Sequence, residues 1–205
     1  VKISVNDVTI NGFTIINSGE NKNPPNHYDS GIYISSNNNY ILNNDICFNL
    51  MGILLVNSKD NEIYSNRITD NIEDAISLFP ESNNNIITYN TIMNTTKEEA
   101  ILLWRSSYNN FEHNYLINNS NGFYIVGRCK ENKIRINLIN ICFISFQSSS
   151  PRLTGNGIVI DSFCSDNTFS WNDIENCSRY GAYLRNTCIS NKFYFNDFIN
   201  SGEQH

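Results

Sequence analysis

Five carboxylates are the side chains of this 205-residue sequence best suited to chemistry. Glu73 and Asp74 are adjacent, and Glu98 and Glu99 form a second adjacent pair. Asp161 follows further along the chain. Two carboxyl groups at a suitable separation can hydrolyse a glycosidic bond, whereas a uronic acid lyase or epimerase needs a base and a cationic clamp for the sugar carboxylate. No motif fixes the geometry of any two of these residues, so they are only candidate catalytic residues.

A second group of side chains combines aromatic rings with arginines and is suited to binding sugars. Sugar rings present apolar C–H faces that pack on aromatic rings, and nearby polar groups fix their orientation. The candidate carbohydrate-binding residues lie on or next to the outer positions of a repeated strand, and they are Tyr33, Phe79, Trp104, Arg105, Tyr124, Arg128, Tyr183 and Arg185. The alternative is that another segment of the parent protein or a second subunit covers these apolar side chains.

A repeated pair of asparagines identifies the elements that must position these residues. The pattern N-x-[VIF]-x-x-N-x-[ILF] occurs eight times, starting at Asn6, Asn39, Asn61, Asn85, Asn109, Asn132, Asn167 and Asn191. Its second asparagines are Asn11, Asn44, Asn66, Asn90, Asn114, Asn137, Asn172 and Asn196. The apolar positions, from Val8 and Phe13 in the first copy to Phe193 and Phe198 in the last, are predicted to point inward. An inward asparagine at a corner can satisfy backbone groups and bond to the asparagine of the next coil.

A second signature lies between consecutive copies and consists of a small residue followed by apolar, variable and apolar positions. Its small residues are Gly31, Gly52, Ala75, Ala100, Gly122, Gly157 and Gly181. The alternation is typical of a short strand. Three short strands in each repeat of 22 to 24 residues cannot bury a face alone, but coils stacked ~4.8 Å apart enclose one interior. The sequence therefore predicts an all-β, single-stranded parallel β-helix of about eight coils, forming one domain over residues 1–205. A leucine-rich repeat has a similar period but needs closely spaced leucines, which this sequence lacks.

The phrases Val8-Thr9-Ile10-Asn11-Gly12-Phe13 and Asn61-Glu62-Ile63-Tyr64-Ser65-Asn66-Arg67-Ile68 resemble the NosD-type family of right-handed β-helices. The resemblance implies a right-handed, pectate-lyase-like solenoid and an extracellular, cell-surface or periplasmic location. The family includes carbohydrate-binding proteins, polysaccharide lyases, hydrolases and epimerases, archaeal surface proteins and copper-related accessory proteins. The few histidines and methionines are scattered over different coils, so no metal site and no cofactor are predicted.

Two insertions interrupt the same corner of the coil, at about residues 18–30 and 143–156. Long loops in a solenoid tend to lie on the binding face. The net charge is −6 and the basic residues are scattered, which argues against a nucleic acid partner. No apolar run is long enough for membrane insertion. The chain begins at Val1 without an initiator methionine, as expected of a segment of a longer protein, whose other domains it could contact.

The leading hypothesis is a β-helix module that binds a polysaccharide or surface glycan through an outward aromatic band between the two inserted loops. One alternative is a polysaccharide-active enzyme, either a lyase, a hydrolase or a uronate epimerase. A second alternative is a structural spacer or a NosD-like metal-related accessory protein.

Overall fold

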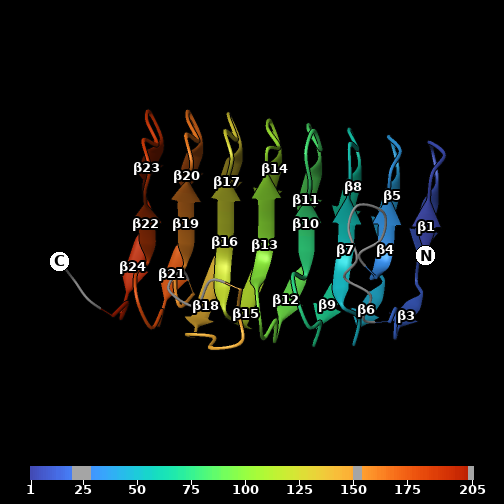
Figure 1. Cartoon of the computed structure of the whole chain (residues 1–205), viewed down its shortest axis with the longest axis horizontal. Helices are drawn as coiled ribbons and strands as arrows, with labels where there is room; N and C mark the ends of the chain where they lie inside the picture. The colour runs from blue at the N-terminus through green and yellow to red at the C-terminus, as the bar shows by residue number, and fades with distance from the viewer. Residues whose placement is uncertain (20–28, 150–153, 203–205) are drawn as a thin grey trace.

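The structure is a computed structural model that describes residues 1–19, 29–149 and 154–202. Within these residues the strands form three parallel sheets of eight strands each, stacked rung on rung along one axis (Figure 1). Each rung contributes one strand to each sheet, and each strand pairs with its equivalents in the neighbouring rungs. The predicted all-β parallel solenoid is confirmed.

The three sheets follow the sequence signatures in order. Sheet A contains the small-residue strands, which are β1 (Lys2–Ile3), β4 (Ser30–Ile34), β7 (Met51–Leu55), β10 (Ile76–Leu78), β13 (Glu99–Trp104), β16 (Asn121–Val126), β19 (Ile158–Asp161) and β22 (Ala182–Leu184). Sheet B contains β2 (Thr9–Asn11), β5 (Tyr40–Leu42), β8 (Glu62–Tyr64), β11 (Ile86–Thr88), β14 (Asn110–Glu112), β17 (Lys133–Arg135), β20 (Thr168–Ser170) and β23 (Lys192–Tyr194). Sheet C contains β3 (Thr14–Ile16), β6 (Asp45–Cys47), β9 (Arg67–Thr69), β12 (Thr91–Met93), β15 (Tyr115–Asn119), β18 (Leu138–Cys142), β21 (Asp173–Glu175) and β24 (Asp197–Ile199).

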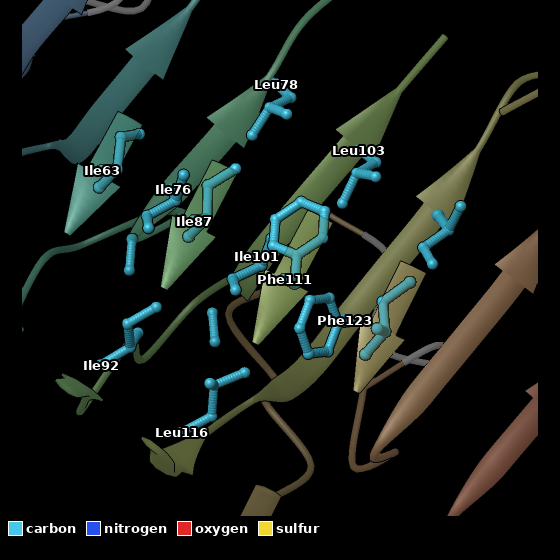
Figure 2. Packing of buried hydrophobic residues seen from close by; sticks show 14 of the residues in the cluster. Ile63, Ile76, Leu78, Ile87, Ile92, Ile101, Leu103, Phe111, Leu116 and Phe123 are labelled. Carbon is cyan, nitrogen blue, oxygen red and sulfur yellow. The ribbon is translucent and has the colours of Figure 1, made fainter. Parts of the chain in front are cut away.

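The core is one column of apolar side chains from all three sheets. Figure 2 shows Ile101 and Phe123 of sheet A, Phe111 of sheet B, and Ile92 and Leu116 of sheet C converging on the interior. All five are fully buried. The rings of Phe111 and Phe123 meet edge to face, with their centroids 5.5 Å apart. Because every rung repeats this arrangement, packing in the interior fixes the alignment of neighbouring strands, and with it the positions of the side chains on the outer face.

Two ladders of buried asparagines run along the corners, as predicted. From Asn39 to Asn191, each side-chain amide of the first ladder donates to the amide oxygen of the next rung at 2.8–3.1 Å. The second ladder, from Asn44 to Asn196, has the same 2.8–3.1 Å spacing. Many of these amides also donate to backbone carbonyls of the preceding rung, so the asparagines fix the corner conformation.

The prediction for the first copy of the asparagine pattern, that Val8 and Phe13 hold its two inward positions, is wrong. In the structure Ile10 pairs with Ile41 and Ile15 pairs with Ile46, so these two isoleucines occupy the inward positions assigned to Val8 and Phe13. Phe13 is 58% exposed, and its backbone amide donates to the Asn44 side chain. The error is a slip of two residues, which keeps each side chain on the same side of the strand. Alternation alone could not detect it.

Both predicted insertions lie between sheet C and sheet A, where β3 leads to β4 and where β18 leads to β19. Residues 20–28 of the first insertion and 150–153 of the second lie outside the described residues. The described part of the second insertion folds back toward β13, because the Ser145 hydroxyl donates to the Thr96 carbonyl at 2.8 Å.

Candidate functional site

A cavity of about 380 Å³ lies on the outer face of sheet A, over β10, β13 and β16. Its lining residues are Met51, Glu73, Asp74, Phe79, Glu98, Glu99, Leu102, Trp104, Tyr124, Val126 and Ser149. Strand β13 crosses the cavity from Glu99 to Trp104, a distance of roughly 17 Å at about 3.3 Å per residue. Carboxyl groups gather at the beginning of this strand and aromatic rings at its end. We call this space the sheet A cavity.

Asp74 and Glu99 form a buried carboxyl pair at the acidic end of the sheet A cavity. Their exposed fractions are 3% and 6%, and the charge of Asp74 acts on the Glu99 carboxyl. Asp74 also accepts a hydrogen bond from the Ser77 hydroxyl at 2.6 Å and from the Glu99 backbone amide at 3.1 Å. The Asn121 amide donates to Glu99 at 3.3 Å. Neighbouring rungs thus hold the pair in a fixed position.

The environment of the pair favours retention of a proton. Burial raises the pKa of Asp74 to about 6, although hydrogen bonds from Ser77 and Glu99 oppose this increase. Burial, followed by the nearby charge of Asp74, raises the pKa of Glu99 well above its usual range. Near neutral pH the pair therefore holds one proton between its two carboxyls. Such a pair offers an acid and a base at one point.

The second insertion forms part of the wall at this acidic end. Glu98 accepts a hydrogen bond from the Ser148 hydroxyl at 2.9 Å and from the Ser149 backbone amide at 2.7 Å. Ser149 also lines the sheet A cavity. Glu98 therefore connects the strand surface to the inserted loop.

The other end of the sheet A cavity is aromatic. Phe79 and Trp104 meet edge to face with ring centroids 5.3 Å apart, and Trp104 is 37% exposed. Trp104 pairs with Val126 on the next rung, whose smaller side chain adjoins the indole. Arg105 lies over the Trp104 ring at 5.5 Å. An exposed indole face with a cationic neighbour is suited to a sugar ring.

Tyr124 links the sheet A cavity to a buried aspartate two strand positions away. Its hydroxyl lies 3.5 Å from the Asp161 carboxylate. Burial, followed by the charges of Asp161 and Glu99, raises the pKa of Tyr124 to about 12. Asp161 also accepts the Asn186 amide at 2.7 Å and lies 3.6 Å from the Arg185 guanidinium. The carboxylate of Asp161 is therefore part of a structural network behind the tyrosine.

A second cavity, of about 490 Å³, is lined by Arg105, Gly127, Arg128, Ser162 and Phe163. We call it the arginine cavity. Gly127 adjoins both cavities, since a Cβ at this position would lie 3.0 Å from Arg105 Cγ and 3.1 Å from Trp104 Cδ1. Among the described residues, neither Arg105 nor Arg128 forms an ion pair with a carboxylate.

The structure brings most of the predicted site residues together and leaves two apart. Phe79, Trp104, Tyr124 and the carboxylates Glu73, Asp74, Glu98 and Glu99 line one cavity, Arg105 and Arg128 line the next, and Asp161 and Arg185 lie behind Tyr124. Tyr33 and Tyr183 lie outside the two cavities. Tyr33 lies 5.8 Å from the Lys2 ammonium, whereas Tyr183 stacks on Tyr180 with centroids 5.2 Å apart and has the Arg185 guanidinium 6.0 Å from its ring. The outward column of sheet A is also not uniformly open, because Leu54, Ser77 and Val159 are buried.

Sequence reasoning missed one polar column that builds the acidic end. Asp74, Glu99, Asn121 and Asn156 each stand immediately before the small residue of sheet A in four successive rungs. Glu99 pairs with Asn121 in the ladder, and the Asn156 backbone amide donates to Asn121 at 2.9 Å. Aligning the small residues of the repeats would have revealed this column. The predicted insertion at about residues 143–156 indicated the position of Ser149, whereas nothing in the sequence indicated the lining role of Met51.

In the part of the chain that the structure describes, no group of three or more histidine, cysteine, aspartate or glutamate side chains is arranged to hold a metal ion. The six cysteines are not joined in disulfides, and five of them are buried. Within the same residues there is no helix long and apolar enough to span a membrane.

Comparisons with known proteins match the chain to right-handed β-helices. A sequence model of the right-handed β-helix region matches residues 1–139, and no curated protein matches the chain. The structure of a periplasmic alginate epimerase superposes with a TM-score of 0.66 at 15% identity, covering 96% of this chain and 43% of that one. The Dettilon tailspike protein gives 0.70 at 14% identity, covering 93% and 41% respectively.

An alginate lyase from Paenibacillus gives a TM-score of 0.54 at 11% identity, covering 83% of this chain and 74% of that one. The chain spans less than half the length of the epimerase and of the tailspike protein. At these identities the likeness concerns the fold.

Proposed function

Because the chain belongs to the right-handed β-helix family, we propose that it binds a polysaccharide in the sheet A cavity. The observation that carries this proposal is the composition of that one cavity. Phe79 and Trp104 offer apolar ring surfaces at one end, and Asp74 and Glu99 offer hydrogen-bonding groups at the other. Sugars require both kinds of contact, because their C–H faces pack on aromatic rings while their hydroxyls need polar partners.

Two further observations support the proposal. The second insertion supplies Ser149 to the cavity wall, and inserted loops on a solenoid commonly form binding sites. An alginate epimerase and an alginate lyase, both named for a polysaccharide substrate, share the fold. The proposal includes an extracellular, cell-surface or periplasmic location, since the epimerase with the same fold is named as periplasmic.

The two tryptophans of the chain provide a matched test. Trp104 lies in the sheet A cavity, whereas Trp171 is 58% exposed and stacks on Phe195 at a different corner of the coil. In a panel of neutral and acidic polysaccharides, at least one should change the fluorescence of a Trp171→Phe variant. In calorimetric titrations, which need no tryptophan reporter, Trp104→Ala should weaken that binding by about tenfold or more, and Trp171→Ala should leave it unchanged. No binding by any member of the panel would reject the proposal and favour the structural spacer.

A second candidate function is catalysis on a polysaccharide, which the buried Asp74 and Glu99 pair favours. The pair combines a raised pKa with a neighbouring carboxyl group, as general acid–base catalysis requires. The candidate reactions are those of a uronate lyase, a uronate epimerase and a hydrolase.

The products distinguish the three enzyme classes, because a lyase forms new unsaturated ends, a hydrolase forms new reducing ends, and an epimerase inverts uronate centres. If the pair is catalytic, one product should form with the unmodified chain and vanish in Glu99→Gln. Asp45→Asn, which alters an exposed carboxylate paired with Arg67, should leave the reaction unchanged. Formation of none of the three products on neutral and uronic acid polysaccharides would reject catalysis while leaving binding intact.

A further inference from the structure

The arginine cavity carries two positive charges that the described part of the protein does not neutralise. Three other arginines form ion pairs, namely Arg67 with Asp45, Arg135 with Glu112 and Arg185 with Asp161. Among the described residues, Arg105 and Arg128 have no such carboxylate, and both are exposed. The chain as a whole has a net charge of −6, so these two arginines form a positively charged site on an acidic protein.

The backbone brings the two arginines to one point. Arg105 directly follows Trp104 at the end of β13, and its backbone amide donates to Val126, which places it beside Gly127 on the next rung. Arg128 comes immediately after that glycine. Gly127 has a φ of +82°, a conformation that glycine adopts without strain, and it contributes no side chain between the arginines. The result is a recess that Ser162 also lines.

The two adjoining cavities have opposite charge. The sheet A cavity is lined by Glu73, Glu98 and the Asp74 and Glu99 pair, whereas the lining of the arginine cavity carries two guanidinium groups and no carboxylate among the described residues. Guanidinium groups bind carboxylate and sulfate oxygens through paired, charge-assisted hydrogen bonds. A carboxylate-lined wall repels such anions but accepts hydrogen bonds from neutral hydroxyls.

We propose that Arg105 and Arg128 form a subsite for the acidic group of a sugar, a carboxylate or a sulfate, while the adjoining sheet A cavity holds an uncharged sugar. This inference rests on the proposed polysaccharide binding and names the class of ligand. The preferred polymer then has an uncharged sugar next to each sugar that carries an acidic group. A homopolymer with a charge on every sugar would place an anion against Glu98 and Asp74. Trp104 lies where the two cavities meet, and a sugar ring on its face would join them.

Nuclear magnetic resonance of the arginine side chains tests the subsite without requiring the natural polymer. The Nε–H signals of Arg105 and Arg128, assigned through Arg105→Gln and Arg128→Gln, should shift when sodium glucuronate or glucose 6-sulfate is added to the whole chain. The larger of the two responses identifies the acidic group. Glucose should leave both signals in place. The signal of Arg67, which is already paired, serves as the control. No shift with either anion, or an equal shift with glucose, would overturn the subsite.

Polymer binding tests the arrangement of the two sugars. Hyaluronan, in which glucuronate alternates with an uncharged sugar, should bind at least tenfold more tightly than polygalacturonate, and Arg128→Gln should remove about that difference. Tighter binding of polygalacturonate would overturn the assignment of an uncharged sugar to the sheet A cavity. Binding of neutral polymers at Trp104 with no arginine response would retain the proposed function and reject the subsite. Anion shifts without binding of any polymer would reject the proposed function instead.

Discussion

Replacement of Asp74 by asparagine should make the protein more stable at neutral and alkaline pH. The folded protein holds the pKa of Asp74 at about 6 because the carboxyl is buried, whereas its ordinary value is 3.8. The folded chain therefore binds a proton in a pH range where the unfolded chain has released it. The free energy of unfolding must fall as the pH rises from about 4 to about 6.

The size of this effect follows from the two pKa values. The interval between 3.8 and about 6, at 1.36 kcal/mol for each pH unit, corresponds to about 3 kcal/mol. Below pH 4 both states are protonated, and the contribution of Asp74 to the pH dependence disappears. The raised pKa of Glu99 extends the decline above pH 6. The side-chain amide introduced by Asp74→Asn keeps an oxygen for the Glu99 backbone amide and carries no charge. In this variant the free energy of unfolding should therefore fall less steeply as the pH rises.

Urea unfolding at a series of pH values from 4 to 8 measures the prediction. Asp74→Asn should match the unmodified chain at pH 4 and exceed its free energy of unfolding by up to about 3 kcal/mol at pH 8. Asp45→Asn, at an exposed ion pair, is the control and should shift the whole curve by less than about 1 kcal/mol. Parallel curves for the unmodified chain and Asp74→Asn between pH 4 and 7 would show that the buried pair holds no extra proton, and the reasoning would be refuted.

Three further predictions concern the solenoid itself. Asn90→Ala should lower the free energy of unfolding by about 3 to 6 kcal/mol in the same urea titration, because it leaves buried amide and carbonyl groups without partners. The control is Asn118→Gly on the exposed outer face, which should change the free energy of unfolding by less than about 1 kcal/mol. Gly122→Ala should lower the free energy of unfolding by about 2 kcal/mol or more, since its Cβ would collide with the backbone of the next rung. Thermal unfolding measures this loss, and an unchanged melting temperature would contradict the packing. Cys188, the one cysteine that is not buried, should react with a thiol reagent before the other five, and mass spectrometry showing a buried cysteine labelled first would indicate that a rung opens.

The regular part of the fold could be predicted because each rung repeats the same physical demands. The asparagine spacing identified both corners, and the small residues identified sheet A. A further polar column, distinct from the two ladders and from the column at the acidic end, could not be predicted although it also joins rungs. In it the Asn49 backbone amide donates to Asn71 at 3.0 Å and that of Thr95 to Asn119 at 3.0 Å. Its members differ in residue type from rung to rung, so no fixed letter marks it in the sequence.

The candidate site could be predicted only as a region. Repeat alignment placed Trp104 and Tyr124 on adjacent rungs, because their positions follow from strand register. The bond between Asp74 and Glu99 depends on side-chain direction at a strand start, which periodicity does not determine. The contact of Glu98 with Ser149 depends on an insertion that folds back over an earlier rung, and no repeat pattern governs the path of an insertion.

The asparagine ladders have a direction, and this direction determines how chemical ageing would damage the protein. Each amide in the ladder donates to the following rung and accepts from the preceding one, as Asn90 does between Asn66 and Asn114. Deamidation would turn such an amide into a carboxylate, which still accepts hydrogen bonds but no longer donates them. At Asn90 the carboxylate would still accept from Asn66, but it would face the Ile63 carbonyl of the preceding rung and the Asn114 amide oxygen of the following one. Only the hydrogen bonds that the preceding rung donates would survive, so damage at one asparagine would loosen its contacts with both neighbouring rungs.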